Sequence, residues 1–103
     1  MNSIKKEKSV RTRLKEFSNI GKLVFFDGEK RGTVIDEVGL TEPNGNAKNF
    51  FQKIRLRNGR IQYRACYYIL NGKKQIWWGQ YAPEIPENDF KQLLIFAQMK
   101  WGI

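Results

Sequence analysis

The stretch "KIRLRNGRIQYR", residues 53–64, decides how the middle of this 103-residue chain folds. Cations and apolar residues alternate on either side of Asn58-Gly59, and a period of two is typical of a β-strand. Asn-Gly strongly favours a two-residue type I′ turn between paired strands. We therefore expect a hairpin in which Arg57 faces Arg60 directly.

A second Asn-Gly pair, Asn71-Gly72, lies between two further apolar runs and predicts another two-residue turn. Across this turn Cys66 would face Trp77. The two turns together predict a three-stranded antiparallel meander over residues 50–81.

Because side chains alternate between the two faces of a strand, this register predicts one apolar and one basic face. The apolar face would contain Ile54, Leu56, Ile61, Tyr63, Ala65, Tyr67, Ile69, Ile76 and Trp78. The basic face would contain the candidate phosphate contacts Lys53, Arg55, Arg57, Arg60, Arg64 and Lys73, together with Tyr68 and Trp77. A slip of one residue would exchange the faces, so we expect the register to be strongly specified.

The N-terminal part of the chain predicts a tail, a helix and a hairpin. Residues 1–8 are expected to form a flexible basic tail, and 9–103 a single nucleic-acid-binding domain. Val10, Leu14 and Phe17 have the spacing of a short amphipathic helix that ends near Gly21. The apolar runs 22–26 and 32–38 predict a first hairpin, and 39–48 a loop.

The C-terminal sequence "PEIPENDFKQLLIFAQMKWG" predicts a closing helix. Pro86 suits the first turn and Gly102 the C-terminal stop. The apolar stripe expected to cover the sheet consists of Phe90, Leu93, Leu94, Ala97 and Trp101. The fold class is therefore α+β, with a five-stranded antiparallel sheet or small SH3-like barrel, a C-terminal helix and a short N-terminal helix.

Missing residue types exclude many enzyme classes. The chain has no histidine and one cysteine, Cys66, so histidine-dependent catalytic pairs and multi-thiolate metal sites are excluded. No phosphate-binding glycine motif occurs, and we expect no metal, no cofactor and no catalytic residue. A metal-dependent nuclease using Asp27, Glu29 and Lys30, with Asp36 and Glu37, is the less favoured alternative.

The distribution of charge favours a polyanionic partner. The formal net charge is +9, and residues 43–83 carry eight cations and no acid. Solubilising surfaces usually mix both signs, whereas a dense basic surface is typical of nucleic-acid binding. Like charges opposite each other, as expected for Lys53 with Arg64 and for Arg57 with Arg60, would destabilise a sheet that had no anionic ligand.

Tyr68 and Trp77 refine the expected partner. Exposed aromatic rings beside arginines stack on unpaired bases or wedge into the minor groove of duplex DNA. Alternatively, the N-terminal helix covers both rings and makes them core residues. We expect nucleic acid, DNA rather than RNA, bound with low sequence specificity.

The order of elements resembles that of small SH3-like DNA-binding proteins of archaeal chromatin. The segments that carry the resemblance are "KLVFFDGEKRGTVIDEV", "KIRLRNGRIQYRACYYILNGKKQIWWG" and "PENDFKQLLIFAQMKWG". In that family the outer face of the meander lies on the DNA minor groove. The resemblance would make Arg55, Arg57, Arg64 and Trp77 contacts, although no diagnostic motif is shared and this chain is longer.

A protein-binding function is the main alternative. Ile95, Phe96 and Met99 lie off the apolar stripe of the closing helix, so they would pack under the N-terminal helix or contact a homodimer or protein partner. In that case the chain is a small interaction or inhibitor protein that docks on an acidic partner or a protein–nucleic-acid complex. No membrane span or signal peptide is expected, and a cytoplasmic location is the default.

Overall fold

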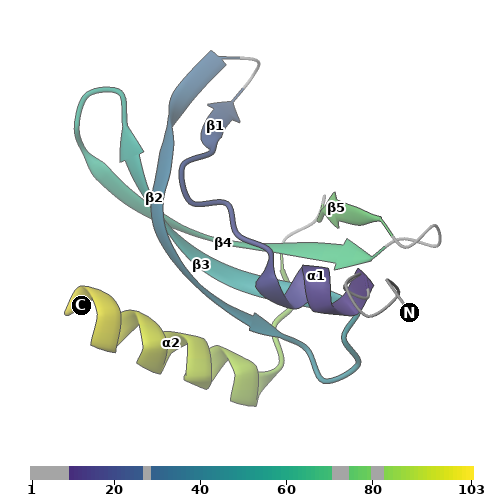
Figure 1. Ribbon diagram of the computed structural model, residues 1–103. Coiled ribbons are helices and arrows are strands. Elements are labelled where there is room, and N and C mark those ends of the chain that lie inside the picture. The colour runs from purple at the N-terminus through teal and green to yellow at the C-terminus, as the bar shows by residue number, and fades with distance from the viewer. Residues whose placement is uncertain (1–9, 27–28, 71–74, 80–82) are drawn as a thin grey trace, which may run out of the picture.

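The computed structural model describes residues 10–26, 29–70, 75–79 and 83–103. Five strands pair antiparallel in chain order and are flanked by two helices (Figure 1). The elements are α1 (Val10–Glu16), β1 (Leu23–Phe26), β2 (Glu29–Thr41), β3 (Ala47–Leu56), β4 (Ile61–Leu70), β5 (Ile76–Trp78) and α2 (Glu87–Trp101). The sheet curls into a half-barrel, and the predicted α+β class is confirmed.

The turn between β3 and β4 differs from the predicted one by one residue. Leu56 N donates to Arg60 O at 2.8 Å, so the loop contains three residues, 57–59, instead of two. Gly59 has φ +87° and its N–H donates to Leu56 O, as expected for a turn closed by a left-handed glycine. Arg55 therefore faces Ile61, and the predicted pairing of Arg57 with Arg60 is wrong.

The register between β4 and β5 is also different. Tyr68 pairs with Trp78 and Ile69 with Trp77, whereas the two-residue turn would have paired Cys66 with Trp77. Asn71, Gly72 and the predicted contact Lys73 lie outside the described residues. The described part of β4 ends at Leu70 and that of β5 begins at Ile76, which pair with each other.

Each register error is an odd number of residues, so the predicted faces are wrong. Gln52 pairs with Arg64, and both side chains lie on one face with Ile54, Cys66 and Tyr68. The opposite face carries Phe51, Lys53, Arg55, Ile61, Tyr63, Ala65 and Trp77. Arg55 and Arg64 therefore lie on opposite sides of the sheet, as do Tyr68 and Trp77.

Half of residues 39–48 belong to strands, and the predicted loop over the whole stretch is wrong. β2 continues to Thr41 and pairs with β3 along most of its length, with an irregularity between Val34 and Asp36. A short turn closes this hairpin, in which Glu42 N donates to Ala47 O and Gly45 has φ +74°. The first hairpin and the meander are therefore one continuous sheet.

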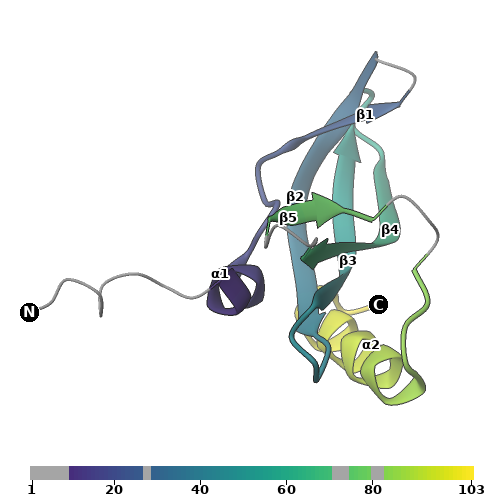
Figure 2. The ribbon, with the colours of Figure 1, turned by 90° about the vertical axis from the view of Figure 1, so that its right-hand side faces the viewer.

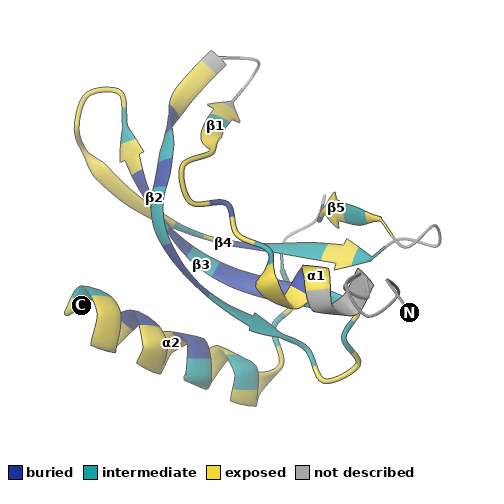
Figure 3. Cartoon of the chain, in the orientation of Figure 1, coloured by how far each residue is buried: buried dark blue, intermediate teal, exposed yellow. Residues whose placement is uncertain are grey.

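The two helices cover opposite faces of the sheet (Figure 2). On the α1 face, Leu14 is fully buried against the sheet layer that includes the buried Val34, Phe50 and Ile54. On the α2 face, Val38 packs with Leu93 and Ala97. Figure 3 shows the buried stretch along β3 between these two layers.

α2 confirms the predicted closing helix. It begins after Pro86 and ends at Gly102, whose φ of +67° lets its N–H bond Gln98 O. Ile95, Phe96 and Met99 are exposed, and α1 lies on the other face, so they do not pack under it. Within the described part of the chain, no helix has both the length and the apolar character needed to cross a bilayer.

Candidate nucleic-acid interface

Four exposed cations gather where the β3–β4 turn meets the start of β2, and we call them the basic end. Arg57 N donates to Arg31 O at 3.0 Å, which brings the turn against β2. Both segments lie at the same end of the molecule in two perpendicular views (Figures 1 and 2). The basic end consists of Lys30, Arg55, Arg57 and Arg60.

The side chains of the basic end face solvent. Among the residues that the structure describes, none makes an ion pair or hydrogen bond with the side chains of Arg55, Arg57 or Arg60. Phe25, Ile61 and Tyr63 lie nearby in the ladder and are 58%, 42% and 46% exposed. The end of the molecule therefore presents unpaired guanidinium groups beside apolar and aromatic surface.

Arg64 has a different environment on the α1 face. Its Nε donates to Gln52 Oε1 at 2.8 Å, and its guanidinium lies 4.8 Å from the centre of the Trp78 ring. Gln52 in turn donates to Glu37 at 3.1 Å, and the other oxygen of Glu37 accepts from Asn19 N at 3.0 Å. Arg64 thus belongs to a largely buried network that joins β2, β3 and β4 to the segment after α1.

Lys48 is a second cation used inside the fold. Its ammonium donates to Lys15 O and Phe17 O at 2.6 and 2.8 Å, so it satisfies carbonyls at the C-terminal end of α1. The side chain also lies over the Phe50 ring, at 4.9 Å from its centre. Desolvation lowers the pKa of Lys48, and the nearby Glu37 carboxylate opposes that shift.

Tyr68 is covered by the segment after α1, so of the two rings that the alternative to base stacking placed in the core, only Tyr68 lies there. Its ring lies 4.6 Å from that of Phe17, and its hydroxyl donates to Asn19 Oδ1 at 2.9 Å. Burial raises the pKa of Tyr68 to about 12 and that of the neighbouring Cys66 thiol to about 12. Tyr68 is therefore a structural residue, whereas Trp77 is 51% exposed on the opposite face.

Lys53 is half-buried and faces Tyr63 across one ladder and Asp36 across the other. The predicted like-charge pairing of Lys53 with Arg64 is wrong, and with it the inference that this part of the sheet is destabilised without an anion. Asp36 itself is bound by the Lys100 ammonium at 2.9 Å and by the Trp101 indole N–H at 2.9 Å. Lys53 is thus less exposed than the cations of the basic end, and it lies beside an acid in the ladder.

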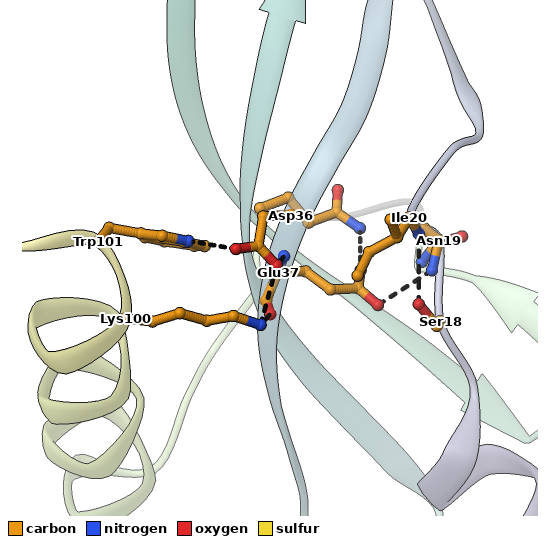
Figure 4. A network of polar contacts seen from close by, with 8 residues as sticks. Ser18, Asn19, Ile20, Asp36, Glu37, Lys100 and Trp101 are labelled. Carbon is orange, nitrogen blue, oxygen red and sulfur yellow. Dashed lines mark hydrogen bonds and ion pairs between the residues drawn. The ribbon is translucent and has the colours of Figure 1, made fainter.

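Asp36 and Glu37 point to opposite faces of β2 (Figure 4). Desolvation raises the pKa of Asp36, but hydrogen bonds from Lys100, Trp101 and the Glu37 N–H outweigh it and hold that pKa below 3.8. The two carboxylates cannot share one metal ion, and the described residues contain no group of three or more Cys, Asp or Glu side chains suited to a metal. Asp27 and the side chain of Glu29 lie outside the described residues.

The structure thus places three of the predicted contacts, Arg55, Arg57 and Arg60, at one end of the molecule, although the register directs Arg60 to the face opposite Arg55. Arg64 and Tyr68 lie farther along the sheet on the α1 face. Of the four contacts implied by the resemblance to archaeal chromatin proteins, Arg64 lies on the wrong face to act with Arg55 and Trp77. Sequence reasoning missed Lys30 at this site. Its position in the turn-forming stretch "DGEKR" could have indicated that it lies at the same end as a neighbouring hairpin turn.

Comparisons with known proteins do not identify a family. No protein-family model, no curated protein and no solved structure matches the chain.

Proposed function

We propose that this protein binds nucleic acid, DNA rather than RNA, through the basic end instead of through a flat sheet face. Arg55, Arg57 and Arg60 would contact phosphates, since a guanidinium fork suits phosphate oxygens. Lys30 adds a fourth cation from β2. Phe25 and Tyr63 supply exposed rings on which bases can stack.

The observation that supports this proposal most is the lack of internal partners at the basic end. Three cations elsewhere are engaged inside the fold: Lys48 caps α1, Arg64 joins the Gln52–Glu37 chain, and Lys100 binds Asp36. Three arginines whose side chains make no ion pair or hydrogen bond with any described residue are therefore available to an external anion. Contacts to phosphates also predict little sequence preference.

The test is binding of single-stranded and duplex DNA across a salt series, followed by fluorescence anisotropy. The variant Arg55→Gln/Arg57→Gln/Arg60→Gln removes the three guanidinium groups of the basic end. The matched control Arg13→Gln/Lys15→Gln/Lys91→Gln removes as much charge from exposed positions on α1 and α2.

We expect the basic-end variant to weaken binding at least about tenfold and to lower the salt slope by about one for each contact removed. The control variant loses only the general attraction of its charge, so its salt slope stays close to that of the wild type. Equal losses in the two variants, or a wild-type affinity that does not change with salt, would contradict the proposal. The ratio of single-stranded to duplex affinity then defines the form of DNA bound.

A further inference from the structure

Among the described residues, the outer edge of β4 has a strand partner over only part of its length. β5 pairs only with Tyr68–Leu70, and Gly79 N donates to Tyr67 O at 2.8 Å. Because Leu56 N bonds Arg60 O, every second residue from Arg60 onward directs its backbone groups toward β3. The backbone groups of Ile61, Tyr63 and Ala65 point outward, and no described residue bonds them.

The side chains along this edge are apolar and exposed on the α2 face. α2 packs mainly on β2 and β3, so Ile61, Ala65, Ile69 and Trp77 stay exposed on β4 and β5, and Tyr63 stays partly exposed beside Trp101 of α2, at 5.4 Å between ring centres. A groove of about 320 Å³ runs between β4 and the helix. Its lining includes Phe51, Tyr63, Ala65, Leu94, Trp101 and Ile103. An exposed, apolar strand edge of this kind is a ready template for pairing with another strand.

The two ends of this edge carry opposite charge. Arg57 and Arg60 lie at the start of β4. Toward the other end, Ile85 packs against the cluster of Val38, Leu93 and Ala97, and Val38 is level with Ala65 through its ladder partner Phe51. The segment before α2 is therefore close to the level of Ala65 and carries the exposed Glu84. Glu87, also exposed, begins α2 and pairs with Lys91 at 3.0 Å.

We propose that the β4 edge pairs antiparallel with the β4 edge of a second copy of this chain. With Tyr63 facing Tyr63 of the second copy, Ile61 faces Ala65, and all the outward-pointing backbone groups of these residues find partners. This orientation places the two basic ends apart and brings each to the level of the other copy's acidic segment. A parallel arrangement would align like charges, so the charge pattern favours a second copy in this orientation over an unrelated strand.

Two substitutions at Ala65 test the β4 edge without truncating a buried side chain. Ala65→Lys places a charge on the exposed apolar face, and Ala65→Pro removes only an N–H that points away from β3. The control Gln62→Lys adds the same charge at an exposed position on the opposite face. Circular dichroism verifies that each variant is folded.

Sedimentation over a range of protein concentrations, without nucleic acid, gives the dimer dissociation constant. We expect concentration-dependent dimers of the wild type and of Gln62→Lys, and at least about tenfold weaker association for both Ala65 variants. Amide hydrogen exchange should show protection of the Tyr63 and Ala65 N–H groups that increases with protein concentration.

A wild type that stays monomeric throughout would overturn the proposal, as would dimers that both Ala65 variants form equally well. Concentration-independent protection of the Tyr63 amide would also overturn it, since that group would then have an internal partner. The sedimentation experiment contains no DNA and the DNA-binding test does not depend on association. Either proposal can therefore fail without the other.

Discussion

Lysine and arginine side chains lie in two different environments in this molecule, under α1 and at the basic end. Lys48 and Arg64 lie on the α1 face, where backbone carbonyls, Gln52 and the Trp78 ring engage them. Arg55, Arg57 and Arg60 extend into solvent at the end of the sheet, and no described residue pairs with them. These cations therefore form one group engaged inside the fold and one group that faces solvent, and only the structure separates the two groups.

Lys48 should give the largest effect on stability. Lys48→Met removes both hydrogen bonds to the end of α1 and leaves the Glu37 carboxylate without its neighbouring cation. We expect a loss of about 3 kcal/mol in the free energy of unfolding, measured with urea. The control Lys15→Met, at an exposed position on α1, should change it by less than about 0.5 kcal/mol. A small loss in both variants would mean that Lys48 is not a structural cation.

Substitution of Arg64 should mainly lower stability, whereas substitution of Arg57 should mainly lower the salt slope of DNA binding. Arg64→Gln breaks the link to Gln52 and the contact with Trp78, so we expect about 2 kcal/mol of destabilisation and little change in the salt slope of DNA binding. Arg57→Gln should cost less than about 0.5 kcal/mol of stability and lower that slope by about one. If Arg64→Gln were the variant that lowered the slope, the division between the two regions would be wrong.

Alkaline pH should weaken the α1 face through Cys66. In the folded protein the pKa of the buried thiol is about 12, whereas in the unfolded chain it is near 9.0. The stabilising contribution is complete below pH 9 and is lost as the pH rises toward 12. Between about pH 8 and pH 10, the wild type should lose about 1 kcal/mol more than Cys66→Ala.

Urea unfolding of the two proteins at both pH values measures this difference. Tyr68, whose pKa is also raised to about 12, contributes in both proteins and cancels in the comparison. Identical losses in the wild type and in Cys66→Ala would show that the thiol is not shielded in the folded protein.

Gly59 should give an effect no larger than that of Cys66, at the turn that supports the basic end. Its φ of +87° strains any residue with a Cβ, although no atom would obstruct a side chain there. We expect Gly59→Ala to destabilise by about 1 kcal/mol and Gly59→Asn by about half as much, since asparagine tolerates this conformation. Thermal unfolding measures both. An alanine variant as stable as the wild type would contradict the left-handed turn.

The existence and type of the elements could be predicted from sequence, because the signals are local. The stripe and caps of α2 gave its bounds nearly to the residue, and β-branched and aromatic runs located the strands. The length of the turn could not be predicted, since Asn58-Gly59 suits either a two-residue turn or a three-residue turn closed by glycine. The one additional residue in the β3–β4 turn decides which side chains of β4 share a face with Arg55.

The register was ambiguous because each face of the meander mixes polar and apolar residues. Gln52, Lys48 and Glu37 have polar or charged side chains, yet they are among the buried residues. Their burial depends on partners distant in sequence, such as the carbonyl of Phe17 and the N–H of Asn19. The alternation of polar and apolar residues alone cannot identify a buried network. The exposure of Arg55, Arg57 and Arg60, in contrast, is what their residue type predicts.

The most direct test of the two-region account is a backbone NMR titration of the protein with a short DNA oligonucleotide. The account predicts that amide shifts move with added DNA from Arg55 to Arg60 and at Lys30, while those of Lys48, Gln52 and Arg64 stay nearly still. Shifts centred on Lys48 and Arg64, with the turn unaffected, would contradict it.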